Sequence, residues 1–333
     1  MDQDADQVAG GLVAAGQGYS LNEFITPEFE ATFVPSVLHM FDVDGQTYLI
    51  PYVYNPAQFF YSKAAFEKAG VTAPKTWDEL LIACEKITAA GLSPIAVESD
   101  IQGYNAVFFT YLLARLKGPG WMKEAAYDKT GEMWKDSAVL QAAQMSVELW
   151  AKGCVPEVSK GYKWPQAQQT VAAGETAMEL VGAWLPTELV SATGPDFQWG
   201  SFNFPEVAGG AGKSTDMMAF MLSYMVLKDA PHPKESFEFI KFMLSEENQK
   251  GMVAAGLVGV PRKGVAWPAN IADSQVAAET ATVVFGEGDG LQGANAELWV
   301  KVIRDPFNDM FVGNVTPEQF VEKLAADTAT FWK

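Results

Sequence analysis

Histidine and cysteine are scarce in this chain, which has 333 residues and two of each. His39 and His232 lie in unrelated sequence contexts, so we expect no histidine-based catalytic site and no zinc site. Cys84 and Cys154 lack the spacing of metal ligands and are too few for a disulfide framework. We interpret them as two buried thiols, with a single disulfide bridge as the alternative. The sequence therefore predicts neither a metal nor a cofactor.

Basic residues are also few, since 23 Lys and Arg face 41 Asp and Glu and give a net charge of −18. A surface of that sign repels a phosphate backbone, so we expect no nucleic-acid partner. No apolar run approaches the roughly 20 residues that span a bilayer. The opening residues MDQDADQ lack the basic and apolar regions of a signal peptide, so we expect no signal sequence within this chain.

Aromatic residues are abundant, with ten Trp, ten Tyr and 21 Phe. Many of these rings must fill the core, because aromatic side chains bury large areas. A saccharide site uses the same residues, since the C–H face of a sugar packs on a ring while its hydroxyls bind polar side chains. Composition alone does not separate the two uses. The chain is long enough, and at 49% hydrophobic residues apolar enough, to form two cores.

The most informative stretch runs from residue 48 to residue 80. Residues 48–54 are apolar and β-forming, and Pro51 marks an irregular strand. The periodicity then changes, and the aromatic residues 59–61 are predicted to lead into a helix that ends at Gly70. Thr76 and Glu79 form a capping box at the start of the next helix.

Three other segments carry motifs of the same kind. Residues 170–188 read as a short helix, a glycine, an Ala-Met strand and a Gly-x-Trp turn; residues 234–262 and 313–326 are helical segments with defined caps. Together with residues 48–80, they resemble the bacterial extracellular solute-binding proteins of the sugar-binding, maltose-binding-like family. The resemblance implies an α/β, two-lobe periplasmic-binding-protein fold of the class II type, with the ligand cleft between the lobes.

The resemblance also implies how the chain divides. The first lobe is expected to comprise residues 1–55 and 222–288, and the second lobe residues 56–221 and 289–333. The family's N-terminal strand-helix-strand-helix unit has no counterpart in this sequence, so the first lobe is expected to be incomplete. We therefore expect this chain to be less stable, or to bind more weakly, than a version with that unit restored.

The function implied by the resemblance is that of the solute-binding component of an ABC importer. Such a protein binds a carbohydrate, here expected to be an oligosaccharide, and delivers it to the importer's membrane subunits. We expect a monomer that is periplasmic, or extracellular and anchored to the membrane by a lipid in its full-length form. The resemblance does not identify the sugar or its length.

Candidate ligand residues follow the strand predicted at 93–97. Ligands of open α/β sheets bind beyond the carboxyl ends of the strands, and Glu98, Asp100, Tyr104 and Asn105 lie at that point. In the family, the corresponding turn carries an acidic residue and a tyrosine that touch sugar. Glu98 and Asp100 have the alternative role of capping the helix that follows.

The remaining candidates come from the crossovers and from two tryptophans. Trp184 matches the family's Gly-x-Trp tryptophan that stacks on sugar, and Trp299 resembles a late tryptophan with the same role. Tyr54, Asn55 and Asp216 are expected near the cleft as hydrogen-bonding groups. The alternative for Trp184 is a ring that fills the interlobe surface without a ligand.

Two alternative functions remain open. A carbohydrate-active hydrolase would use two cleft carboxylates, for which Glu98 and Asp100 are candidates by composition alone. A sensor or scaffold without transport would follow if the cleft were lost. The glycine-rich loop at 208–216 lacks the first glycine of a phosphate-binding loop, and the GxGxxG at 288–293 lacks the second strand with its acidic residue. We therefore expect no nucleotide site at either loop.

Overall fold

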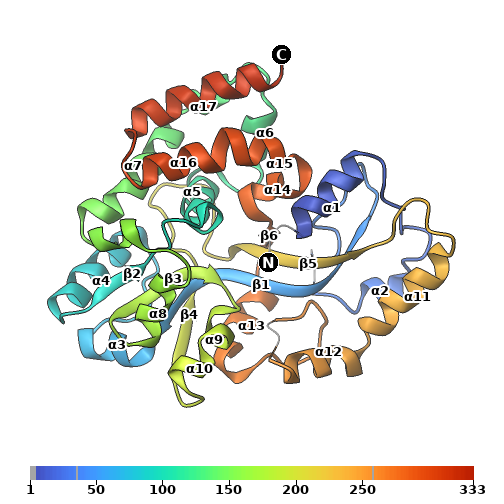
Figure 1. Ribbon diagram of the computed structural model, residues 1–333, viewed down its shortest axis with the longest axis horizontal. Helices are drawn as coiled ribbons and strands as arrows, with labels where there is room; N and C mark the ends of the chain where they lie inside the picture. Colours follow the sequence, from blue (N-terminus) through green and yellow to red (C-terminus); the bar gives the residue numbers. More distant parts are fainter. Residues whose placement is uncertain (1–4, 35–36, 257–258) are drawn as a thin grey trace.

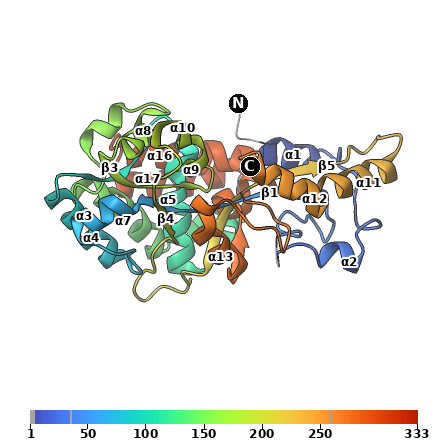
Figure 2. The same ribbon diagram turned by 90° about the horizontal axis from the view of Figure 1, so that it is seen from below.

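Two long antiparallel strands form the centre of the protein. The structure is a computed structural model that describes residues 5–34, 37–256 and 259–333. Strands β1 (Leu49–Ser62) and β5 (Asp216–Met225) run side by side between two groups of elements, as Figure 1 shows. Figure 2 shows these groups at opposite ends of the long axis. The chain thus has the expected mixed α/β, two-lobe fold.

Strand β1 changes its partners halfway along its length. Its first half, from Leu49 to Pro56, pairs with β5; from Ala57 onward it pairs with β3 on one edge and β4 on the other. Proline has no amide hydrogen to donate, so the pairing of β1 with β5 ends at Pro56 and the pairing with β3 begins at the next residue. The exchange falls between Pro56 and Ala57.

The second lobe is built around the far end of β1. The sheet has the order β2-β3-β1-β5-β6, and β4 also pairs with β1. Its largest core packs the buried face of helix α5 against β3 and α7. The elements of this lobe are β2 (Ser93–Ala96), β3 (Thr176–Gly182), β4 (Trp199–Phe202), α3 (Lys63–Ala69), α4 (Trp77–Ala89), α5 (Gln102–Lys117), α6 (Trp121–Tyr127), η1 (Glu132–Lys135), α7 (Ser137–Ala151), η2 (Glu157–Gly161), α8 (Gln166–Ala172), α9 (Leu185–Glu188) and α10 (Val190–Thr193).

The first lobe is smaller and has its own core. Phe237 and Ile240 of α11 pack there with Phe29, Phe33 and Ile50. Its helices are α1 (Ala5–Ala14), α2 (Pro27–Glu30), α11 (Pro233–Met243) and α12 (Glu246–Ala254). None of the helices in the described ranges is both long and apolar enough to cross a membrane.

The C-terminal third consists of short helices, one short strand and the final long helix. Its elements are η3 (Ala269–Ile271), α13 (Ala272–Glu279), β6 (Val283–Phe285), η4 (Glu287–Gly290), α14 (Leu291–Ala294), α15 (Ala296–Leu298), the π-helical η5 (Trp299–Arg304), α16 (Asp305–Phe311) and α17 (Pro317–Phe331). Helix α13 packs on β4, and Ser274 hydrogen-bonds Gln58 of β1. The predicted division assigned α13 to the first lobe, yet these contacts are with elements of the second. The division of the chain into lobes stays a prediction.

Helix starts are where sequence and structure agree best. Thr76 and Glu79 form the predicted capping box of α4, and Gly70 ends α3 with a φ of 63°. Thr316 caps α17 with a second capping box. These signals are local, because each cap binds amides only a few residues away.

Residues 59–61 lead into helix α3 as predicted, but the strand predicted at residues 48–54 runs on through them. Strand β1 continues to Ser62, and helix α3 begins only at Lys63. Phe59 and Phe60 each pair on both edges, with β3 and with β4, and both are fully buried. Pairing on two edges satisfies the backbone N–H and C=O groups of the run, and together with the burial of both rings it outweighs the local helical pattern.

The interpretation of the two cysteines as free thiols was also wrong. Cys84 of α4 and Cys154, which follows α7, form a disulfide with 5.1 Å between their Cα atoms. Both residues are fully buried in the core of the second lobe. The packing of α4 and the β2 edge brings them together, and no spacing rule reveals such a long-range pairing.

Candidate functional site

Three aromatic rings lie together where strands β1 and β5 meet the second lobe. The Trp184 ring lies 5.9 Å from that of Tyr104 and 4.9 Å from that of Phe220, between centroids. Tyr104 comes from the first turn of α5, Trp184 precedes α9 and Phe220 lies on β5. Trp184 and Phe220 are only half-buried, whereas Tyr104 is buried. The rings are close enough to form one aromatic surface, which we call the aromatic group.

The position of the Trp184 ring depends on a glycine in β3. A Cβ atom added to Gly182 would lie 2.0 Å from a carbon of the Trp184 indole. No side chain larger than hydrogen fits there without moving the ring. The Gly-x-Trp motif is therefore a packing requirement, because the glycine lets the indole lie directly against the end of β3.

Asn55 belongs to the same surface. It pairs with Phe220 across β1 and β5, so the two side chains lie on one face of the ribbon. Asn55 is 6% exposed, and its Oδ1 has no hydrogen-bond partner within the described residues. The buried Trp184 Nε1 likewise has none in the same part of the chain. Buried polar atoms are usually paired, so a donor and an acceptor beside exposed ring surface suit a polar ligand.

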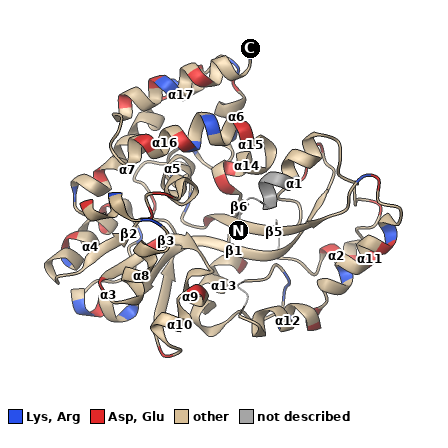
Figure 3. Cartoon of the chain, in the orientation of Figure 1, with Lys and Arg blue, Asp and Glu red and all other residues tan. Residues whose placement is uncertain are grey.

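Strands β1 and β5, which carry part of the aromatic group, contain almost no charged residues. Strand β1 has no charged residue and β5 has one, Asp216, whereas acidic and basic side chains are spread over the outer helices, as Figure 3 shows. Asp216 is buried, and its Oδ2 accepts a hydrogen bond from the Lys213 amide. Its backbone oxygen binds Arg115. These bonds fix the loop that precedes β5. Within the described residues, no hydrogen bond joins Asp216 to a ring of the aromatic group.

Glu98 holds the first turn of α8 in place, and Asp100 holds the loop before it. Glu98 is 1% exposed, and its Oε1 accepts hydrogen bonds from the amides of Ala167 and Gln168 at 2.8 and 3.1 Å. Asp100 is exposed and accepts from the Trp164 amide at 2.9 Å. Burial raises the pKa of Glu98, and the two amide bonds oppose that rise. Both carboxylates therefore brace the turn that carries Tyr104.

Glu98 belongs to a cluster of three carboxyl groups, in which Glu98 and Glu179 are buried while Glu188 keeps an exposed side. Burial raises the pKa of Glu179 on β3 well above its ordinary value, and the nearby Glu98 and Glu188 raise it further. Glu188 of α9 also has a raised pKa because of burial, and it contacts Gln168 at 3.5 Å. A protonated Glu179 is the form that the fold favours. The cluster connects the turn between β2 and α5 with helix α9. Tyr104 lies just after that turn, and Trp184 lies just before α9.

Tyr54 and Asn105 are structural residues. Tyr54 is fully buried, its ring packs edge-on against Trp267, and its hydroxyl contacts the Met217 sulfur. Asn105 is buried and donates to the Glu98 carbonyl and to Asn308 Oδ1, at 3.2 and 2.7 Å. The expectation that they bind ligand hydroxyls is not supported by this placement, because their polar groups have protein partners.

Trp299 is the clearest departure from the expected site. Its ring is 0% exposed in the core of the second lobe, its Nε1 donates to Glu287, and it packs under Gly288. A ring without an exposed face cannot stack on a sugar in this conformation. The assignment of Trp299 as a sugar platform is therefore corrected to a core role, while Trp184 and Tyr104 lie together as expected.

Two partly exposed aromatic residues were missed in the sequence, one in the aromatic group and one in the loop that Asp100 binds. Phe220 lies in an apolar strand, where nothing distinguishes it from core residues. Trp164 is 50% exposed next to Asp100, which binds its amide. Its position before α8 places it at the same end of the sheet as Glu98. A tryptophan next to Pro165 in a polar loop was the only signal, and it is a weak one.

Comparison with known proteins places this chain in a family. A model of the family described as bacterial extracellular solute-binding protein matches residues 1–250. An uncharacterized ABC transporter extracellular-binding protein of Pyrococcus horikoshii is 28% identical over 69% of this chain and 51% of its own length. The multiple sugar-binding protein of Streptococcus mutans is 24% identical over 61% of this chain and 48% of its own length.

A solved structure supports the same assignment. A chitin oligosaccharide binding protein matches with a TM-score of 0.78 and 25% identity over 97% of this chain and 80% of its own. The chain spans about half the length of the curated relatives that it matches. Because the family model covers three quarters of the sequence, the chain belongs to the bacterial extracellular solute-binding protein family.

Proposed function

We propose that this protein binds a carbohydrate, in particular an oligosaccharide, at the aromatic group between its lobes. The observation that carries the proposal is the arrangement of Tyr104, Trp184 and Phe220 beside the unpartnered Asn55 Oδ1 and Trp184 Nε1. A sugar has an apolar C–H face for the rings and hydroxyls that both donate and accept. The names of two relatives, one for multiple sugars and one for chitin oligosaccharides, support this ligand class.

Within this proposal, the protein is a monomeric receptor that passes its sugar to the membrane subunits of an ABC importer. The name of the Pyrococcus relative, which refers to an ABC transporter and to extracellular binding, supports that role. The buried Cys84–Cys154 disulfide fits a location outside the cytoplasm, because thiols inside it are kept reduced. That location is periplasmic, or extracellular with a lipid anchor.

Ligand binding acts by shifting the lobes towards a closed arrangement. Strands β1 and β5 cross between the lobes, so small changes along them re-orient one lobe against the other. The ligand favours closure only by the difference between its affinities for the two arrangements. Catalysis has no part in this proposal, since Glu98 and Asp100 use their carboxylates to hold backbone amides.

A panel of saccharides tests the proposal. Isothermal titration calorimetry and intrinsic tryptophan fluorescence with chitobiose, chitotetraose, raffinose and stachyose would measure binding, and an assay for new reducing ends would detect hydrolysis. We expect saturable binding of at least one sugar without release of reducing ends. Absence of binding across the panel would contradict the proposal, and release of reducing ends would favour the hydrolase.

A further inference from the structure

The two strands that join the lobes separate at one point, and both of them change partners there. The register of β1 with β5 ends at the pair formed by Pro56 and Ala219. In the same register, the next pair would be Ala57 and Met218. Instead, Ala57 pairs with β3 and Met218 pairs with β6. We call the point between Ala57 and Met218 the fork.

A tyrosine hydroxyl occupies the fork. Tyr111 of α5 donates to the Ala57 carbonyl oxygen at 2.6 Å, and its own oxygen accepts a hydrogen bond from the Met218 amide at 2.9 Å. In a continued antiparallel ladder, that amide and that carbonyl would bond each other directly, with about 2.9 Å between nitrogen and oxygen. The hydroxyl therefore satisfies both groups and holds them farther apart than a direct bond does.

The Tyr111 ring is fixed by its neighbours. It is 1% exposed, stacks on Phe204 with 4.8 Å between centroids, and meets Phe285 at the end of β6 edge-on at 5.8 Å. The Arg115 guanidinium lies 5.1 Å from the ring centroid and donates to the carbonyl oxygen of Asp216, the first residue of β5, at 3.0 Å. Burial raises the pKa of Tyr111 to about 12, so the hydroxyl keeps the proton that it donates to β1.

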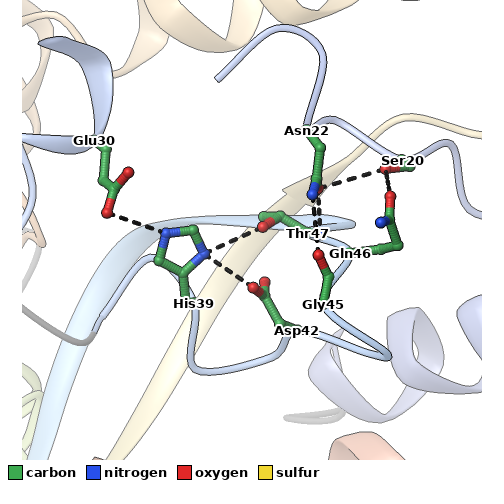
Figure 4. A network of polar contacts seen from close by, with 8 residues as sticks. All are labelled: Ser20, Asn22, Glu30, His39, Asp42, Gly45, Gln46 and Thr47. Atoms are coloured by element: carbon green, nitrogen blue, oxygen red, sulfur yellow. Dashed lines mark hydrogen bonds and ion pairs between the residues drawn. The ribbon is translucent and has the colours of Figure 1, made fainter. Parts of the chain in front are cut away.

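The first-lobe end of β1 is held separately from the fork. Asn22 donates to the Gly45 carbonyl at 3.0 Å and accepts from the Thr47 amide at 2.7 Å, as Figure 4 shows. His39 Nδ1 lies 3.3 Å from the Thr47 hydroxyl and 2.9 Å from Asp42 Oδ2. Thr47 is buried and stands two residues before β1. Because the other end of β1 pairs with β3 and β4, the fork lies between two braced segments.

The fork is close to the candidate site. The pair formed by Asn55 and Phe220 lies two residues from the fork on each strand, which is about 7 Å. Tyr104 lies seven residues before Tyr111 on α5, which is about two helical turns or roughly 10 Å. Positions seven residues apart lie on one face of a helix. Helix α5 therefore connects the aromatic group directly with the fork.

We propose that Tyr111 is a positioning residue, whose hydroxyl sets how far β1 and β5 separate at the fork and so limits the range of angles between the lobes. Moving one lobe against the other requires backbone rotation where the shared ladder ends, and the hydroxyl restrains both strands at that point. A narrow range of angles leaves less freedom for a ligand to restrict, which favours binding. The inference goes beyond the proposed function, because it concerns the ligand-free protein.

Double electron–electron resonance on the ligand-free protein tests this role. Spin labels are attached to Lys68→Cys of α3 and Lys234→Cys of α11, one exposed position in each lobe, while the native cysteines are joined in the disulfide. Tyr111→Phe keeps the ring and removes the hydroxyl, and we expect it to broaden the distribution of distances between the labels. Ser146→Ala removes a buried hydroxyl from α7 and is the matched control, whose distribution should equal that of wild type.

An unchanged distribution in Tyr111→Phe would overturn the proposal and would leave the register shift between Pro51 and Val53 as the place of bending. Equal broadening in Ser146→Ala would overturn it as well, because the effect would then be a general loosening of the fold. If Tyr111→Phe fails to fold, Phe285→Leu removes one support of the ring and should broaden the distribution in its place.

A titration separates this role from the proposed function. Where wild type binds a sugar, we expect Tyr111→Phe to bind it about tenfold more weakly, since the ligand must then restrict a wider range of angles. Equal affinity would contradict the link between the fork and binding. If wild type binds no sugar while Tyr111→Phe still broadens the distance distribution, the proposed function fails and the role of Tyr111 stands.

Discussion

Reduction of the Cys84–Cys154 disulfide should destabilise the protein measurably. The bridge joins α4 to the segment after α7, and both cysteines are fully buried in the core of the second lobe. It restrains the unfolded chain across 70 residues. In the chain-entropy model, a loop of that length contributes about 4 kcal/mol at 25 °C.

The corresponding change in melting temperature follows from the size of the chain. An unfolding entropy of roughly 2.1 cal/mol/K per residue gives about 0.7 kcal/mol/K for 333 residues. A loss of about 4 kcal/mol therefore lowers the melting temperature by about 6 °C. The fall in melting temperature is larger if the second lobe unfolds on its own, because the unfolding entropy of one lobe is smaller than that of the whole chain.

Differential scanning calorimetry with and without dithiothreitol measures this effect. The double variant Cys84→Ser/Cys154→Ser is the control, since it should melt at the lower temperature under both conditions. Alkylation of the unfolded, unreduced protein followed by mass spectrometry shows whether the thiols are free. Alkylation of both cysteines in unreduced wild type would show that the disulfide is absent. A melting temperature that dithiothreitol leaves unchanged would contradict the predicted stabilisation.

Three further predictions concern the site and its surroundings. Gly182→Ala should displace the Trp184 ring and weaken sugar binding at least about tenfold without unfolding the protein, as titration and circular dichroism would show; unchanged affinity would contradict the packing argument. Glu179→Gln should flatten the pH dependence of stability: burial raises the pKa of Glu179, so wild type is fully stabilised below the ordinary pKa of a glutamate and loses stability as pH rises towards the folded value. Thermal melts from pH 5 to pH 8 check this, and parallel profiles of both proteins would exclude the effect. Trp299→Ala should cost about 3–5 kcal/mol of stability in chemical denaturation, while Trp299→Phe keeps the sugar affinity of wild type; weaker binding by that variant would return Trp299 to the site.

The parts of the fold that the sequence predicts well are those with local causes. Thr76 with Glu79, and Thr316 with its glutamine partner three residues on, satisfy amides within a few residues, so their motifs suffice to identify the helix starts. The end of β1 was misplaced because its course depends on β3 and β4, which lie more than 100 residues further along the chain. Pairing between such distant segments leaves no trace in the local pattern.

Only part of the candidate site was predicted, because exposure of a side chain also depends on segments far away in the sequence. Trp184 could be found because it matches the Gly-x-Trp motif of the resembled family, and the structure shows that Gly182 lets the ring lie against β3. Trp299 was chosen by the same kind of resemblance, yet its ring is fully buried in the core of the second lobe. Phe220 and Trp164 gave the opposite error, since the exposure of an aromatic side chain depends on tertiary packing. Residue type indicates what a side chain can bind, and only the fold determines whether a ligand can reach it.

The most direct test of the central claim is a titration of Trp184→Ala with the sugar that wild type binds best. Loss of the stacking ring should weaken binding by about 2 kcal/mol or more, which is close to thirtyfold, while the melting temperature stays near that of wild type because the ring is half-exposed. A dissociation constant equal to that of wild type would contradict a sugar site at the aromatic group.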